Sequence, residues 1–128
     1  MRRQSHLHFV LFSFACAWLV HGIVFAADSY PQRPIRLIIP FASGGAADII
    51  GRILGAKLAE ALGQQLVIDI RPGAGSMLGT DLAAKANPDG YTLVLVATAH
   101  ALNPGLVSKM PYDAIKDFAP ITMAVESP

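Results

Sequence analysis

Three stretches of this sequence, each directly after an apolar run, gather residue types that suit the binding of an anion. They are residues 40–48 (PFASGGAAD), residues 71–76 (RPGAGS) and residues 98–104 (TAHALNP). Together they offer backbone amides beside glycines, hydroxyls, one imidazole and one carboxamide, all of which can hydrogen-bond a carboxylate. The residue types therefore predict a carboxylate-binding site.

The same residues do not form a catalytic or metal-binding constellation. A structural zinc site needs about four Cys or His ligands, yet Cys16 is the only cysteine and His100 is the only histidine after residue 26. His100 is accompanied neither by a Ser-His-Asp order nor by paired carboxylates, the partners that catalysis would require. We therefore expect no enzymatic activity, no metal and no cofactor.

One glycine pattern supports an alternative function. Gly73, Gly75 and Gly79 follow an apolar run and open a predicted helix, as in a loosened dinucleotide-binding fingerprint. That fingerprint also needs an acidic residue about 20 positions further on, to bind the ribose. Residues 94–98 contain no Asp or Glu, and the glycine spacing is wrong by one. A fragment of a nucleotide-binding α/β oxidoreductase is therefore the weaker alternative to a binding protein.

The first 26 residues are predicted to be an export signal. Arg2 and Arg3 give a positive start, residues 9–20 are an uncharged apolar run, and residues 24–26 offer a cleavage site after Ala26. A membrane anchor is the alternative, but His21 and Gly22 interrupt the second half of a stretch that barely reaches spanning length. We expect a periplasmic protein without stable membrane insertion after cleavage.

The composition limits both size and partners. The chain has 128 residues, of which 53% are hydrophobic and 15% charged, so it forms at most one folded domain. Its formal net charge is +1. This near-neutral balance argues against nucleic acid as a partner.

The apolar pattern after residue 34 alternates between strands and helices. Residues 35–39, 66–70 and 91–97 are predicted strands. Residues 48–62 are a predicted amphipathic helix ended by Gly63, with an apolar stripe of Ile50, Ile53, Leu54, Leu58, Ala61 and Leu62. A second helix is predicted from a Ser76 cap to about Ala86, with Leu78 and Leu82 facing the core.

This alternation predicts an α/β fold with a parallel sheet covered on both faces. Beyond it, residues 102–110 are weakly helical, residues 113–117 could form one turn and residues 118–125 are a predicted last strand. In such a sheet, ligands bind beyond the carboxyl ends of the strands, where helix N-termini present unpaired N–H groups. The three polar stretches are therefore expected to meet at one edge.

Each polar feature also has a purely structural explanation. A Gly-Gly pair before a helix is often only a turn, and Arg71 is a surface charge more often than an anion ligand. Asp48 suits the positive end of its helix and caps N–H groups better than it suits acid–base chemistry. No single one of these features predicts a binding site. The prediction depends on the expected meeting of the three loops at one edge of the sheet.

A series of short motifs runs along the chain after the predicted signal. They are YP at 30–31, RPI at 33–35, IPF at 39–41, GG at 44–45 before Asp48, RPGAG at 71–75, PDGYTL at 88–93, TxHAxNP at 98–104, PYD at 111–113 and KDFAP at 116–120. In order and spacing they resemble the substrate-binding proteins of tripartite tricarboxylate transporters, also called Bug-type receptors.

The resemblance implies a monomeric periplasmic receptor whose two α/β lobes close on a small mono- or dicarboxylate and deliver it to the membrane components of a transporter. Residues 1–26 would be the signal peptide, and residues 27–128 the N-terminal part of the first lobe, an incomplete lobe of a type II-like periplasmic-binding-protein fold without its second lobe. The expected ligand-binding residues are Phe41, Ala42, Ser43, Gly44, Gly45, Asp48, Arg71, Gly73, Gly75, Thr98, Ala99 and His100. Ala46, Ile70 and Met77 depart from residues frequent in the family, which would alter ligand orientation or selectivity.

Overall fold

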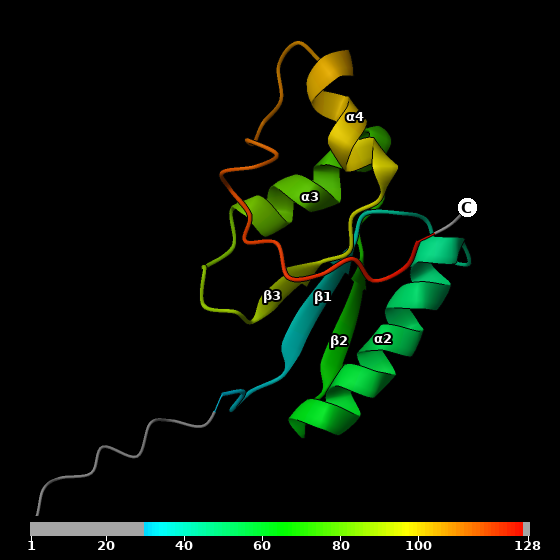
Figure 1. Ribbon diagram of the computed structural model, residues 1–128, viewed down its shortest axis with the longest axis vertical. Helices are drawn as coiled ribbons and strands as arrows, with labels where there is room; N and C mark the ends of the chain where they lie inside the picture. Colours follow the sequence, from blue (N-terminus) through cyan, green and yellow to red (C-terminus); the bar gives the residue numbers. More distant parts are fainter. Residues whose placement is uncertain (1–29, 127–128) are drawn as a thin grey trace, which may run out of the picture.

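The computed structural model describes residues 30–126, so the predicted signal peptide and its cleavage site lie outside the described residues. The elements in chain order are β1 (Ile35–Ile39), α2 (Ala46–Leu62), β2 (Leu66–Ile70), the single 3₁₀ turn η1 (Ala74–Ser76), α3 (Met77–Ala84), β3 (Thr92–Val94) and α4 (Thr98–Leu106). The alternation of strands and helices confirms the predicted α/β class (Figure 1).

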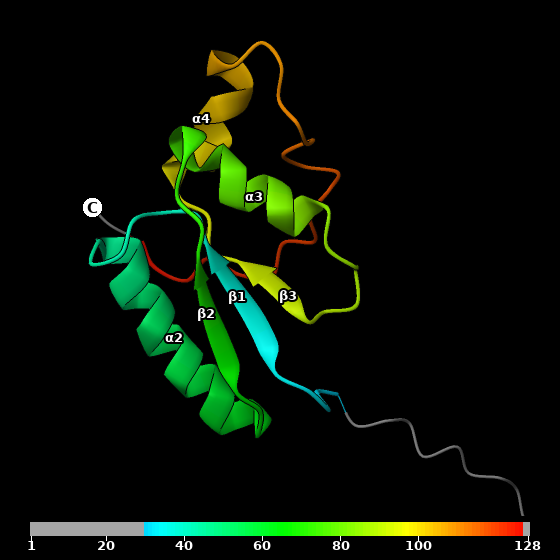
Figure 2. The ribbon, with the colours of Figure 1, turned by 180° about the vertical axis from the view of Figure 1, so that it is seen from behind.

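The three strands form one parallel sheet in the order β2-β1-β3. Ile38 of β1 lies opposite Asp69 of β2 and Val94 of β3. Because successive side chains of a strand point to opposite faces, Ile39 and Pro40 lie on different faces of the sheet. The helix α2 packs against Ile39 and α3 packs against Pro40, so both faces are covered, as Figure 2 shows from behind.

The hydrophobic core lies between the sheet and α2. Ile35, Leu37, Ile39 and Leu66 are its buried members. The half-buried side chains packed against them include Leu58, Ile68, Ile70, Leu93 and Leu95. These short apolar strands owe their formation to that burial, because β-branched and leucine side chains gain most from leaving water on a pleated surface.

The face that α2 turns to the sheet is set by glycines. Gly51 and Gly55 are buried and lie directly over Ile39 and Ile68. The helix backbone therefore approaches the sheet closely. The predicted apolar stripe was wrong in part, because Ile53 is 61% exposed on the far side of the helix. Ala61 and Leu62, in the last turn, are also exposed.

A glycine likewise sets the buried face of α3. A Cβ on Gly79 would lie 2.7 Å from Pro40 Cβ, and the neighbouring Thr80 is fully buried. Leu78, which was predicted to face the core, is 53% exposed, and Leu82 is exposed too. Ser76 precedes the helix, but its backbone is left-handed and its side chain makes no capping bond, so the predicted cap was wrong.

The region after β2 differs from the prediction in its boundaries. The helix α3 ends at Ala84, and β3 is shorter than the predicted strand. The helix α4 begins at Thr98, in a stretch expected to be a loop, and it includes Pro104. Pro104 has no N–H to donate to the carbonyl of His100, and α4 ends two residues later at Leu106.

The C-terminal segment forms the predicted turn but not the predicted strand. The N–H of Asp117 donates to the carbonyl of Asp113 at 3.3 Å, which closes the turn. Within residues 30–126, residues 118–125 belong to no strand, and in Figure 1 this red segment carries no arrow. The reason is that a strand needs a hydrogen-bonded neighbour, and none of the three described strands pairs with this segment.

The beginning of the described chain is fastened to the start of β3. The hydroxyl of Tyr30 donates to the carbonyl of Gly90 at 2.6 Å, and the Tyr30 and Tyr91 rings pack edge to face. Arg33 pairs with Asp89 at 2.8 Å and lies 4.0 Å from the centroid of the Tyr91 ring. These contacts fix residues 30–34 at the amino-terminal end of the sheet.

Candidate functional site

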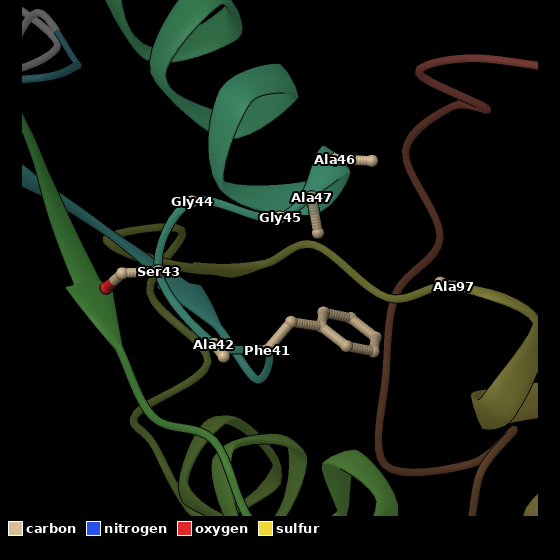
Figure 3. A pocket seen from close by; sticks show the side chains of 8 residues that line it. All are labelled: Phe41, Ala42, Ser43, Gly44, Gly45, Ala46, Ala47 and Ala97. Atoms are coloured by element: carbon tan, nitrogen blue, oxygen red, sulfur yellow. The ribbon is translucent and has the colours of Figure 1, made fainter.

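An open pocket lies beyond the carboxyl end of β1, where the chain turns into α2 (Figure 3). Its volume is about 590 Å³. The lining residues are Phe41, Ala42, Ser43, Gly44, Gly45, Ala46, Ala47 and Ala97. Ala97 immediately precedes α4, so the first polar stretch meets the start of the third.

The side chains give this pocket an apolar wall. In Figure 3 the Phe41 ring points from the β1 end toward Ala97, and the Ala47 methyl group points toward the ring. The Ser43 hydroxyl points to the other side of the loop, away from Phe41. Polar recognition inside the pocket therefore depends on the backbone more than on side chains.

That backbone is the amino-terminal end of α2. Gly45 is the capping residue, with extended φ and ψ of −81° and 172°, and no side chain caps it. The N–H groups of Asp48 and Ile49 both donate to the Gly45 carbonyl, at 3.0 and 3.1 Å. The preceding amides of the first turn have no intrahelical acceptor. Together with the positive end of the helix dipole, they suit a bound carboxylate.

The carboxylate of Asp48 holds the loop that leads into this helical turn. Its side chain is only 7% exposed, accepts the Gly44 N–H at 2.8 Å and pairs with Arg52 Nε at 2.7 Å. The Gly44 N–H lowers the pKa of Asp48, burial opposes it, and Arg52 lowers it further. Both carboxylate oxygens are engaged by groups of the protein, so Asp48 supports the loop before α2, whereas the expected capping of helix N–H groups is absent.

The second polar stretch does not line the pocket. Arg71 Nε donates to Asp69 Oδ1 at 2.8 Å, and Arg36 holds the other oxygen of Asp69. Burial raises the pKa of Asp69, but the hydrogen bonds from Arg36 and Arg71 outweigh it, and the pKa lies below its usual value. Asp69 is a charged residue that the sequence analysis did not single out. Its place inside a predicted apolar strand, two positions before Arg71, was a signal.

Gly73 and Gly75 lie in a left-handed stretch of backbone between β2 and α3. The Gly75 carbonyl accepts a hydrogen bond from Asn103 Nδ2 of α4 at 3.1 Å. This loop therefore lies beside α4, although neither glycine lines the pocket.

The third stretch forms the first turn of α4. Thr98, Ala99 and His100 follow Ala97, and no side chain caps the start of this helix. The Nε2 atom of His100 lies 3.0 Å from the carbonyl oxygen of Ala114, and the His100 ring packs against Tyr112 and Phe118. In this structure His100 holds the segment after α4 rather than lining the pocket.

The expected ligand-binding residues did not include three of the lining residues, Ala46, Ala47 and Ala97, although the first two belong to the first polar stretch. Alanine carries no chemical signal, and these positions matter through backbone amides and surface shape alone. Among residues 30–126, no group of three or more His, Cys, Asp or Glu side chains is arranged to hold a metal ion. In the same part of the chain, none of the helices combines the length and apolarity that a membrane span requires.

Comparison with known families decides the relationship. Residues 50–128 match the family described as Tripartite tricarboxylate transporter family receptor. The chain belongs to this family. Among curated proteins, BugT of Bordetella pertussis is 42% identical over 105 residues, which cover 80% of this chain and 32% of BugT.

Solved structures agree with this assignment. The periplasmic binding protein BugD is 36% identical, with a TM-score of 0.69 over 72% of this chain and 31% of that chain. MatC from Rhodopseudomonas palustris, solved with bound malate, is 37% identical, with a TM-score of 0.68 over 71% of this chain and 31% of that chain. The expected family and the periplasmic-binding-protein fold are therefore confirmed.

The family is one of receptors rather than enzymes, and the comparisons do not favour the oxidoreductase alternative. The chain spans 31% to 32% of the length of BugT, BugD and MatC.

Proposed function

We propose that this receptor-family chain binds a small mono- or dicarboxylate in the periplasm, for delivery to the membrane components of a tripartite tricarboxylate transporter. The observation that carries the proposal is the uncapped amino-terminal end of α2 on the wall of an open pocket, in a chain of this family. The malate bound to MatC supports a carboxylate as the ligand class.

In the proposed complex, one carboxylate accepts hydrogen bonds from the amides of the first turn of α2. Phe41, Ala42, Ser43, Gly44 and Gly45 form the loop that shapes the site, and Asp48 holds that loop through the Gly44 N–H. Arg71, Gly73 and Gly75 follow β2, and Thr98, Ala99 and His100 form the first turn of α4 after β3. We propose all six as further ligand residues, which lie outside the lining of this pocket.

A backbone substitution tests the central contact. Ala46 is the first helical residue after Gly45, a position where proline fits the helix and removes only an N–H group that the helix does not use. The extended backbone of Gly45 also suits a residue before proline. Ala46→Pro should therefore keep the fold, and Ala46→Ser, which retains the amide, is the matched control.

The measurement is isothermal titration of the exported protein, purified from its host, with malate, acetate and the neutral diamide of malate. We expect binding of an acid but not of the diamide. Ala46→Pro should raise Kd roughly tenfold or more, since a hydrogen bond to a charged group is lost, while Ala46→Ser should change it little. Binding of NAD with no binding of acids would instead favour the oxidoreductase alternative.

Export and domain organisation belong to the same proposal. We propose that residues 1–26 are removed after Ala26 and that residues 27–128 form the N-terminal part of the first lobe of a monomeric receptor. The intact mass and amino-terminal sequence of the exported protein test the cleavage, and a first residue other than Ala27 would contradict it. Sedimentation of the same sample tests the monomer.

A further inference from the structure

The loop between β2 and α3 has an unusual backbone. Gly73, Ala74, Gly75 and Ser76 are four consecutive residues with positive φ, at 137°, 48°, 61° and 76°. Ala74 and Ser76 carry a Cβ, which disfavours the left-handed region. Such a conformation persists only where surrounding contacts impose it.

Two buried side chains supply these contacts. Thr80 of α3 donates its hydroxyl to the Ser76 carbonyl at 2.9 Å, within one helical turn. Asn103 of α4 donates Nδ2 to the Gly75 carbonyl at 3.1 Å, across 28 positions of sequence. Asn103 is 7% exposed, so water cannot readily replace its amide if the side chain is removed.

Asn103 therefore connects two of the three loops at the edge of the sheet. Its own helix begins directly after Ala97, which lines the pocket. The first loop has a separate support, because Asp48 accepts the Gly44 N–H from within α2. The first loop and the 73–76 loop are thus each held by a buried polar side chain that does not itself line the pocket.

We propose that Asn103 is a positioning residue, which holds the 73–76 loop against α4 and so fixes the geometry of the edge that binds the carboxylate. This inference rests on the proposed function, and it assigns Asn103 no contact with the ligand. The hydrogen bond sets the loop conformation, and the loop conformation sets affinity.

The test uses three variants of the exported protein. Asn103→Asp keeps the size of the side chain but replaces the donor with a carboxylate that opposes the Gly75 carbonyl. Asn87→Asp makes the same change at the other asparagine of the sequence, in an exposed turn. Leu66→Val weakens the core at the far end of β2 and controls for general loss of stability.

The first readout is amide hydrogen exchange without ligand, and the second is titration with malate. We expect Asn103→Asp to speed exchange selectively in residues 74–78 and to raise Kd roughly tenfold. Asn87→Asp and Leu66→Val should leave both unchanged at temperatures well below unfolding. The exchange readout does not depend on any ligand.

Unchanged exchange in Asn103→Asp would overturn the proposed bracing. Faster exchange with an unchanged Kd for malate would overturn the positioning role, because the loop would then move without consequence for binding. If the unsubstituted protein binds no carboxylate, the proposed function fails, and the positioning role fails with it. The exchange data still decide whether Asn103 holds the 73–76 loop in place.

Discussion

Among single residues, Asp48 has the strongest structural connection to the pocket. It accepts the Gly44 N–H and pairs with Arg52 while being almost completely buried. A side chain in this position acts on the ligand only through the loop that it supports. The two partners also explain why a charged group is tolerated there, since a buried carboxylate needs hydrogen bonds and an opposite charge.

Asp48→Ala should therefore weaken both stability and carboxylate binding. The Gly44 N–H loses its acceptor and the first loop is released, so we expect a lower Tm and a higher Kd for malate. Glu60→Ala is the control, because Glu60 lies on the same helix in an exposed pair with Lys57, and such pairs contribute little. An unchanged Kd in Asp48→Ala would show that the loop keeps its shape without this support.

Some residues of the site could be predicted and others could not. The sequence of the first loop identified most of the pocket lining because a glycine pair before a helix carries a local signal. Ala46, Ala47 and Ala97 line the pocket because of their position in the fold. An alanine side chain gives no indication of such a role in the sequence. His100 carried a signal for chemistry, yet its ring packs against Tyr112 and Phe118.

At the scale of the elements, the spacing between α2 and the sheet depends on two glycines. A Cβ at position 51 would lie 2.3 Å from Ile39 Cδ1, and one at position 55 would lie 3.1 Å from Ile68 Cδ1. Ile39 is fully buried and has no room to move aside. The helix can therefore lie this close only while these positions lack side chains.

Gly51→Ala is expected to destabilise the protein by about 1–2 kcal/mol net, because an overpacking cost of up to about 3 kcal/mol outweighs the gain in helix propensity of about 1 kcal/mol. Gly105→Ala is the matched control, since a Cβ there meets no atom within 4 Å and the site is also helical. It should be neutral or slightly stabilising. Chemical denaturation measures both, and equal effects of the two substitutions would contradict this account of the packing.

The same glycines explain why the faces of α2 and α3 were harder to predict than the elements themselves. The strands β1 and β2 have the predicted bounds, because a short apolar run between turn residues is a strong signal. Apolar periodicity places the large side chains inward, whereas Gly51, Gly55 and Gly79 place the backbone inward instead. Ile53 and Leu78 are exposed for that reason.

In the molecule as a whole, three aspartates share one electrostatic property. Hydrogen bonds from Gly44 hold the pKa of Asp48 below its usual value, and those from the Lys116 and Ile115 N–H groups do the same for Asp113. The pKa of Asp69 is also lowered, since Arg36 and Arg71 outweigh the effect of burial. Asp48 lies beside the first loop, Asp69 lies in the strand β2, and Asp113 lies in the C-terminal turn.

These lowered pKa values predict sensitivity to acid. A carboxyl whose pKa is lower in the folded chain stabilises the fold above its unfolded value of about 4, and that contribution is lost as pH falls through the folded pKa. Tm should therefore be flat from pH 7 to about pH 5 and fall below about pH 4. Asp69→Asn should flatten this fall, and an equally steep fall in that variant would argue against the contribution of Asp69.

The opposite ends of the sheet also make this molecule suitable as a tethered sensor. Tyr30 and Arg33 are fastened to Gly90 and Asp89 at the amino-terminal end of the strands, whereas the pocket lies beyond the carboxyl end of β1. A five-residue strand separates the two by roughly 16 Å. A surface linker attached just before Tyr30 would therefore leave the pocket facing solution, and an environment-sensitive dye near Ala97 could report occupancy without obstructing the attachment.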